Sequence, residues 1–239
     1  MKTTTPIEML ATEGADSAHW YRHVGEKVWL PSVSTILGTL KDGLEYVSAY
    51  DLRIASERGT KIHQATEHLE AGHVLQKQNF TAKEWDMLGG FIGWRNTCQL
   101  TTTASELRMA NKKLGYAGTL DRIYVIGSGL ALVDIKTTAS IYPKAWLQVA
   151  AYAALAEKEG HKIMHTAILR LTDKSKAKYQ WEFRDRTEWQ KDLKAFNKVL
   201  DTWRYFNEGS QPKESDLPDE LSLNPSDSGS GATLIVGGL

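Results

Sequence analysis

Two carboxylates and a lysine interrupt a stretch of sequence that otherwise suits two buried β-strands. The stretch is GTLDRIYVIGSGLALVDIKTT, residues 118–138, and its central GSG predicts a turn between the strands. Asp121 falls in the first strand, and Asp134 and Lys136 fall in the second. Because residues at i and i+2 point to the same face of a strand, Asp134 and Lys136 share a face. A turn centred on the serine places Asp121 near Ile135, so the two carboxylates can converge.

This combination of side chains fits the hydrolysis of a phosphodiester. Two neighbouring carboxylates repel each other and are costly to bury, and a divalent cation offsets both effects. Mg²⁺ and Mn²⁺ prefer oxygen ligands and leave room for water and phosphate. A lysine beside them can orient the attacking water or neutralise charge in the transition state.

The same alternation of Asp and Lys also fits a solvated strand face with a weak surface ion pair. The flanking residues argue against that alternative. The sequence ALVDI, residues 131–135, is almost continuously apolar, which favours a strand covered on both faces. A charged side chain in such a strand rarely lacks a role.

The rest of the chain predicts the elements that must position these groups. Apolar spacing indicates a helix from Leu44 to about Gly72, with a buried stripe that includes Ile54 and Ile62. Gly59 lies inside it, so either two helices meet there or another group approaches closely. The sequences TAKE (81–84) and TEWQ (187–190) have the form of capping boxes. We expect short strands on either side of Gly25 and a short helix after Ser32, helices over 44–72, 82–98, 142–160 and 187–206, and strands over 104–112, 117–126, 130–138, 162–172 and 176–185.

This order of elements predicts an α/β fold with a mixed central sheet flanked by helices. We expect one domain over 1–209, the one that carries out the phosphodiester chemistry, with a helical layer over 31–100 and a catalytic core over 101–209. Residues 210–239 are rich in Ser, Pro, Gly and acid, a composition that does not fold alone. That tail has one basic and five acidic residues, so its formal charge is −4 and that of the body is +4.

Four segments, in order, resemble the RecB-type branch of the PD-(D/E)XK nucleases. They are RGTKIHQATE, GYAGTLDRI, LVDIKT and QVAAY, and the resemblance covers about residues 31–155. In that branch a helix supplies a metal-binding His, a glycine-led strand the first Asp, the next strand D-x-K, and a following helix Q-x-x-x-Y. Segments similar to LPSVSTIL (30–37) occur in phage exonucleases and in relatives of the mitochondrial genome maintenance exonuclease. The resemblance implies a restriction-endonuclease-like core.

The resemblance also implies roles for individual residues. His63, Asp121, Asp134 and the backbone carbonyl of Ile135 would bind metal, and Lys136 would position the water. Glu106 matches an acidic residue that holds a metal-bound water or a second metal. Gln148 and Tyr152 share a helix face, because they are at i and i+4. The resemblance implies that this face braces Lys136 and touches DNA.

Other interpretations stay open for several of these residues. His63 could be an ordinary half-buried helix residue, and Glu106 a surface acid. Gln148 and Tyr152 could pack the helix on the sheet. Arg58 could hold a phosphate or be solvated, and Trp146 could stack on a base or belong to the core.

Composition limits the cofactors and partners. The single cysteine, Cys98, excludes an iron–sulfur cluster, and no apolar run is long enough to span a membrane. The N-terminal sequence lacks the apolar core of a signal peptide, which favours a cytoplasmic protein, of a phage or a bacterial host. The sequence contains no G-x-x-x-x-G-K-[ST] motif, so it does not indicate a helicase. The acidic tail could bind a recombination or single-strand-binding protein.

We therefore expect an exonuclease that uses one or two Mg²⁺ or Mn²⁺ ions on DNA that is single-stranded or has a free end, in recombination or repair. A structure-specific endonuclease on the same core is the alternative enzyme. A DNA-binding module that no longer cleaves is the alternative from another class. The Asp–Asp–Lys set argues against a pure binder, because acid would repel the phosphates that it binds.

Overall fold

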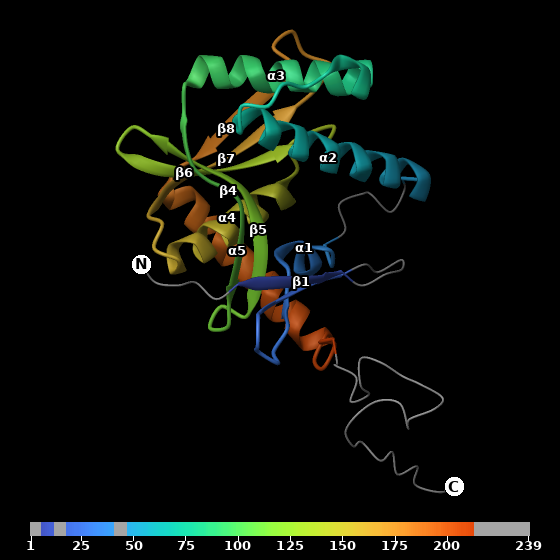
Figure 1. The fold of residues 1–239 in the computed structure, drawn as a ribbon. Coiled ribbons are helices and arrows are strands. Elements are labelled where there is room, and N and C mark those ends of the chain that lie inside the picture. Colours follow the sequence, from blue (N-terminus) through green and yellow to red (C-terminus); the bar gives the residue numbers. More distant parts are fainter. Residues whose placement is uncertain (1–5, 12–17, 41–46, 213–239) are drawn as a thin grey trace, which may run out of the picture.

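A five-stranded mixed sheet forms the centre of the computed structural model, which describes residues 6–11, 18–40 and 47–212 (Figure 1). The strand order is β4-β5-β6-β7-β8, and β6 and β7 are parallel while the other neighbours are antiparallel. The predicted α/β class is confirmed. The strands are β4 (Thr101–Asn111), β5 (Tyr116–Ile126), β6 (Gly129–Lys136), β7 (Ile163–Leu171) and β8 (Tyr179–Arg184).

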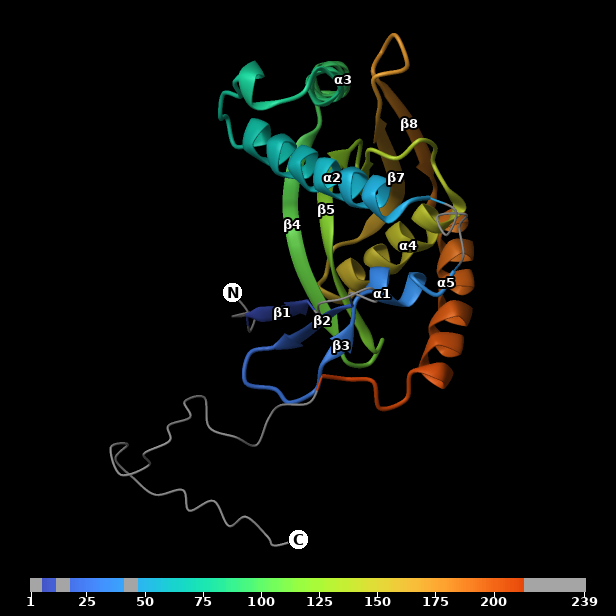
Figure 2. The ribbon, with the colours of Figure 1, turned by 90° about the vertical axis from the view of Figure 1, so that its right-hand side faces the viewer.

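Two pairs of helices cover the two faces of this sheet (Figures 1 and 2). Helices α2 (Ala49–Glu70) and α3 (Ala82–Cys98) lie on one face, and α4 (Pro143–Lys158) and α5 (Arg186–Phe206) lie on the other. Helix α4 connects β6 to β7, because a parallel pair needs a crossover connection. The order β4-β5-β6-α4-β7 is the core that the resemblance implies.

Apolar residues alternate between two core clusters along the central strands. On β5, Ile123 packs with α4 and α5, and its neighbour Tyr124 packs with α2 and α3. On β6, Leu132 and Val133 divide in the same way. The alternation follows from the two-residue period of a strand. Strand β6 is therefore covered on both faces, as its apolar sequence predicts.

The helix caps follow the sequence with one correction. Thr81 and Glu84 form the predicted capping box at the start of α3. The expected box at 187–190 is displaced: Asp185 caps α5 with Glu188, so the helix begins at Arg186. An Asp is as good a cap as a Thr, and the side chain that meets the N3 backbone N–H decides where the helix begins.

A small sheet and a short helix precede this core. Strands β2 (His19–His23) and β3 (Leu30–Pro31) were predicted, whereas β1 (Ile7–Ala11), which pairs with β2, was not. The short helix α1 (Val33–Leu37) packs with α4 and α5, not with α2 and α3. The expected helical layer over 31–100 is therefore divided between two faces.

Helix α2 is continuous through Gly59, so two helices do not meet there. Its buried residues begin at Ile62, and Ile54 is 39% exposed, so the predicted stripe is wrong in its first half. In Figure 1 the N-terminal end of α2 extends beyond the sheet, and the side chains of residues 49–54 are exposed. A Cβ at Gly59 would lie 3.6 Å from Oγ1 of Thr137, an ordinary contact, so residue 59 lies beside the chain that follows Lys136. The expected start of this helix at Leu44 lies outside the described residues.

Candidate active site

Three side chains from three elements converge at the predicted metal site. His63 of α2, Glu106 of β4 and Asp121 of β5 each offer one ligand atom, and these atoms lie within 4.8 Å of one another. Nδ1 of His63 is 3.5 Å from Oδ1 of Asp121. Residues predicted from distant parts of the sequence therefore meet in space. Glu106 belongs to the central group and is not peripheral to it.

The β5–β6 hairpin fixes both aspartates. Arg122 pairs with Val133, so Asp121 is one residue from the expected register, and its Oδ2 accepts a 2.7 Å hydrogen bond from the Ile135 N–H. Asp134 is 1% exposed, and its two oxygens lie 3.1 and 2.9 Å from Nζ of Lys136. Among the described residues, Asp134 does not join the three-residue group.

Two residues of helix α4 form a hydrogen-bond chain with the lysine. Nζ of Lys136 donates a 2.8 Å hydrogen bond to Oε1 of Gln148, and Nε2 of Gln148 donates to the Tyr152 hydroxyl at 3.1 Å. Gly118 explains the glycine that leads β5. A Cβ there would lie 2.5 Å from Cε1 of Tyr152, so glycine allows the ring to approach the strand.

A buried arginine holds Glu106 in an unusual conformation. Glu106 has φ of 46°, in the left-handed region that non-glycine residues seldom adopt. Nη1 of Arg122, which is fully buried, donates to Oε1 of Glu106 at 2.9 Å and to the Asp121 carbonyl at 2.7 Å. This contact turns the Glu106 carboxylate toward the metal site.

The same arginine connects the hairpin to α2. Nε of Arg122 donates to Oε2 of Glu70 at 2.7 Å, and Tyr124 and Arg95 contact the other oxygen of Glu70 at 2.7 and 3.1 Å. Glu70 follows His63 by two helical turns and so lies on the same side of α2. The ion pair therefore anchors the helix that supplies His63 to the strand that supplies Asp121.

Sequence inspection missed Glu70, Arg95 and Arg122. One signal was present: the arginine directly follows Asp121 inside a strand that is otherwise apolar, and a buried arginine requires a partner. Glu70 lies two helical turns after His63, so the sequence places a candidate partner on the same side of that helix.

His63 and Asp121 form an ion pair in the metal-free protein. Burial alone would lower the pKa of His63, but the adjacent Asp121 carboxylate raises it to about 9. Burial would raise the pKa of Asp121, but the charges of His63 and Lys136 lower it. A metal ion that binds both side chains must displace the proton of His63.

The remaining acids favour a compensating cation. Burial raises the pKa of Asp134 to about 6, and burial with the Asp121 charge raises the pKa of Glu106. Burial disfavours the Lys136 ammonium, yet the charges of Asp134 and Asp121 raise its pKa above the usual value. These two charges therefore favour the ammonium form of Lys136 in the metal-free protein.

These donors fit a hard divalent metal ion. One imidazole and two carboxylates form the group, and oxygen-rich sets of this kind suit Mg²⁺ and Mn²⁺. Oδ2 of Asp134 is buried and lies 2.9 Å from the Lys136 ammonium, but it accepts no hydrogen bond of good geometry, so a further positive partner could bind it.

Two further residues predicted to contact DNA, Arg58 and Trp146, have different environments in the structure. Arg58 is half-buried on α2, and its Nε is buried without a hydrogen bond. Trp146 is 6% exposed, and the Arg184 guanidinium covers its ring at 4.2 Å from the ring centroid. The ring is therefore part of the core, and the prediction that it contacts substrate is corrected. Arg184 of β8, which covers the ring, is distant from Trp146 in the sequence, so only the folded chain shows that the ring is buried.

Known proteins offer a few likenesses to this chain. No protein-family model and no curated protein sequence matches it significantly. Among solved structures, it is similar to an alkaline exonuclease, LHK-Exo from Laribacter hongkongensis. That likeness has a TM-score of 0.38 at 10% sequence identity, over 75% of this chain and 92% of that chain. The structure of LHK-Exo in complex with dAMP has a TM-score of 0.36 at 10% identity, over 74% of this chain and 90% of that one.

Proposed function

We propose that this chain is a metal-dependent deoxyribonuclease. The observation that supports the proposal is the convergence of His63, Glu106 and Asp121 beside a buried Asp134–Lys136 pair. Carboxylates concentrated in this way repel DNA unless a cation is bound. A protein that only binds DNA has no reason to concentrate them where the phosphates must lie.

The residues of the chain divide the chemistry between them. His63, Glu106, Asp121, Asp134 and the Ile135 carbonyl would hold one or two Mg²⁺ or Mn²⁺ ions. A bound ion supplies Lewis acidity toward the phosphate and favours ionisation of water. The Lys136 ammonium, held by Gln148, orients the water and stabilises the additional negative charge on the phosphate. Gln148 and Tyr152 keep that ammonium in place.

The proposed reaction is a single displacement at phosphorus. The water oxygen forms a bond to phosphorus as the bond from phosphorus to the 3′ oxygen breaks. The water loses one proton to solvent, and the leaving 3′ oxygen takes up one. The products are a 5′-phosphate and a 3′-hydroxyl. Lys136 donates hydrogen bonds to the water and to the phosphate.

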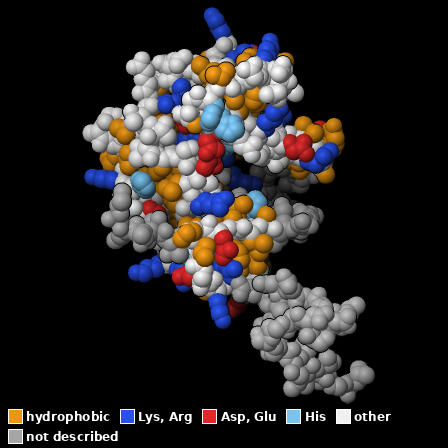
Figure 3. All heavy atoms as spheres, viewed as in Figure 1, with side chains coloured by type: hydrophobic (Ala, Val, Ile, Leu, Met, Phe, Trp, Pro, Cys, Tyr) orange, Lys and Arg blue, Asp and Glu red, His pale blue; other side chains and the backbone are white. Residues whose placement is uncertain are grey.

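We place the activity on DNA that is single-stranded or has a free end. Helix α2 covers the hairpin, since its His63 reaches Asp121 and its Glu70 reaches Arg122. In space-filling form, a hollow lies between the N-terminal part of α2 and the elements below it, with Lys or Arg side chains on its inner wall (Figure 3). One strand can pass through a narrow basic opening more readily than a duplex. Arg58, in this part of α2, would contact a phosphate.

The proposed setting is recombination or repair in a phage or in the cytoplasm of a bacterial host. Among the residues that the structure describes, no helix has the length and hydropathy needed to cross a bilayer. The acidic segment 210–239 is proposed as the contact for a recombination or single-strand-binding protein. Residues 213–239 lie outside the described part of the chain.

A matched pair of substrates tests the proposal. A linear single strand and a covalently closed circle of the same sequence are incubated with Mg²⁺, with Mn²⁺, and with EDTA. We expect the linear strand to be degraded with either metal, the circle to survive, and EDTA to stop the reaction. Equal cutting of the circle would establish the endonuclease alternative. Binding of both without cleavage in any metal would establish the silent binding module.

A further inference from the structure

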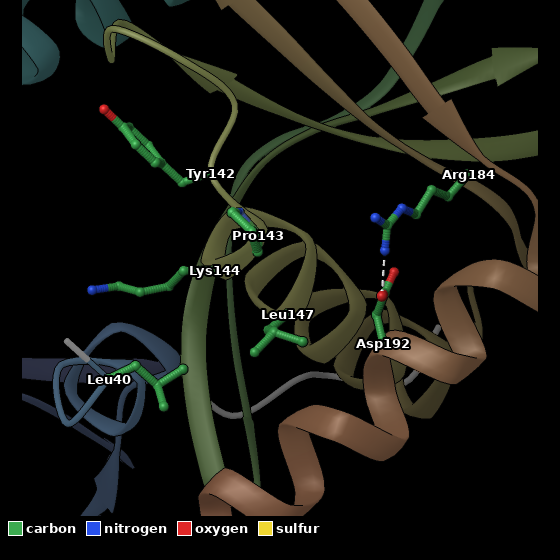
Figure 4. Close-up of a pocket in the computed structure, with 7 residues that line it drawn as sticks. All are labelled: Leu40, Tyr142, Pro143, Lys144, Leu147, Arg184 and Asp192. Atoms are coloured by element: carbon green, nitrogen blue, oxygen red, sulfur yellow. Dashed lines mark ion pairs between the residues drawn. The ribbon is translucent and has the colours of Figure 1, made fainter. Parts of the chain in front are cut away.

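A cavity of about 380 Å³ opens at the start of α4, outside the metal site (Figure 4). Its wall includes Tyr142 and Lys144 from the start of α4, with Leu147 one turn further on, and Leu40 from the segment after α1. Figure 4 shows Tyr142 and Lys144 extending away from the Arg184–Asp192 ion pair at the other end. The volume lies within the range of pockets that bind small ligands.

The cavity begins one helical turn from the residue that holds the catalytic lysine. Lys144 and Gln148 are at i and i+4 on α4, so they share a face and are separated by about one pitch of ~5.4 Å. Gln148 in turn accepts the hydrogen bond from Lys136 at 2.8 Å. A strand whose phosphate lies at Lys136 therefore reaches Lys144 within about one nucleotide.

The loop between Lys136 and Tyr142 is braced, so the two ends keep a fixed relation. Arg170 of β7, which pairs with Lys136 in the sheet, donates hydrogen bonds to the carbonyls of Thr138 at 2.8 Å and Ala139 at 2.5 Å. Oγ1 of Thr138 also donates to the Ser140 carbonyl at 2.8 Å.

The lining suits a nucleotide. Tyr142 is 37% exposed and presents an aromatic ring, Leu40 and Leu147 add apolar surface, and Lys144 adds a cation. Among the described residues of the wall, the carboxylate is that of Asp192, and its pairing with Arg184 limits its repulsion of phosphate. An aromatic ring beside a cation is the combination that holds a base and its phosphate in single-strand binding.

We propose that this cavity binds one nucleotide of the strand being cut, next to the scissile phosphate, with its base on Tyr142 and its phosphate at Lys144. This subsite deepens the proposed nuclease function and depends on it for the position of the strand. It explains why an exposed tyrosine stands at the start of the helix that carries Gln148.

Base removal at one position tests the subsite. Fluorescent single strands, each with a single abasic site at a different position, are bound to the protein in Ca²⁺ and followed by anisotropy. We expect weaker binding when the missing base is the one that occupies the cavity. Tyr142→Ala should weaken binding of the intact strand about 10-fold. It should have no effect on the strand abasic at that position, and Tyr142→Phe should restore binding.

Two further variants separate base from phosphate and specific from general effects. Lys144→Gln should weaken the intact and abasic strands equally and reduce the salt dependence by about one unit of slope. Tyr205→Ala changes a tyrosine that is 80% exposed at the far end of α5, and should change nothing. If Tyr142→Ala weakens every strand alike, or none, the subsite is wrong.

The cleavage assay keeps this result separate from the function itself. If the wild-type protein degrades DNA but Tyr142 shows no coupling to a base, the nuclease proposal stands and the subsite proposal is wrong. If the coupling is present but the protein cleaves no DNA in Mg²⁺ or Mn²⁺, the nucleotide site stands and the nuclease proposal is wrong.

Discussion

Asp134 and Lys136 are a buried pair whose removal should separate cleavage from DNA binding. We expect Asp134→Ala and Lys136→Ala each to lower the single-turnover rate by at least about 10²-fold, the scale for loss of one transition-state contact. Binding should persist, because most affinity for DNA comes from phosphate contacts elsewhere. Asp134→Ala should bind DNA as well as the wild type or better without metal. Rates from end-labelled DNA and Kd from anisotropy measure the two effects.

An aspartate–lysine ion pair on the surface provides the matched control for these variants. Asp86 forms an ion pair with Lys178 at 2.8 Å and is half exposed, so its charge is solvated. Asp86→Asn should cleave at the wild-type rate. Wild-type turnover by Asp134→Ala or Lys136→Ala would remove the hairpin from the mechanism.

His63 should make the stability of the metal-free protein depend on pH. Its pKa is about 9 in the folded protein and about 6.5 when unfolded. The raised pKa means that its contribution is complete below pH 6.5 and is lost as pH rises through 9. In EDTA, the free energy of unfolding should fall by about 1–3 kcal/mol between pH 6.5 and 9.5. Urea denaturation at several pH values measures the slope.

Two histidine variants on α2 test this assignment. His63→Gln should lack the decline, and His68→Gln, which changes an exposed side chain of the same helix, should retain it. The affinity for Mn²⁺, measured by calorimetry, should rise by up to about tenfold per pH unit below pH 9, because the ion displaces the proton. A wild-type affinity that does not change with pH would contradict the role of His63 as a ligand.

At the scale of elements, the Glu70–Arg122 pair holds α2 on the sheet. Among the described residues, Glu70→Ala leaves the fully buried Arg122 with Glu106 as its remaining carboxylate partner. Because Glu106 still compensates the charge, we expect a loss of about 1–3 kcal/mol in the free energy of unfolding, the cost of buried donors left without their acceptor. Metal affinity should also fall, since His63 and Glu106 both depend on this contact.

The control for this element lies on the same helix. Glu57 forms an exposed i,i+4 pair with Arg53 at 3.5 Å. Glu57→Ala should change the free energy of unfolding by less than about 1 kcal/mol. Urea titrations of both variants make the comparison, and an equal effect of the two would show that Glu70 does not anchor the helix.

At the scale of the whole molecule, we expect residues 1–209 to contain all of the chemistry. The residues proposed for metal, water and DNA lie between Leu40 and Tyr152, and α5 ends at Phe206. A chain truncated after Gly209 should retain the wild-type single-turnover rate on short DNA, measured by rapid quench. A truncated protein with a native circular dichroism spectrum and no cleavage would show that the tail belongs to the site.

The sequence by itself determined the local geometry of this protein. The two-residue period of a strand put Asp134 and Lys136 on one face, and the helical period put Gln148 and Tyr152 on another. The Gly-Ser-Gly turn determined the register of the hairpin to within one residue. Each of these relations depends on covalent geometry over a few residues, so it does not require knowledge of the rest of the fold.

Only the tertiary structure decided which distant side chains meet. The left-handed Glu106, the partner of Arg122, and the burial of Trp146 under Arg184 each depend on segments far apart in sequence. The face that α1 covers and the exposed first half of α2 depend on which surfaces are left after the larger elements pack. Periodicity marks an apolar face but not its partner, because hydrophobic burial has no direction of its own and close packing selects among the possible contacts.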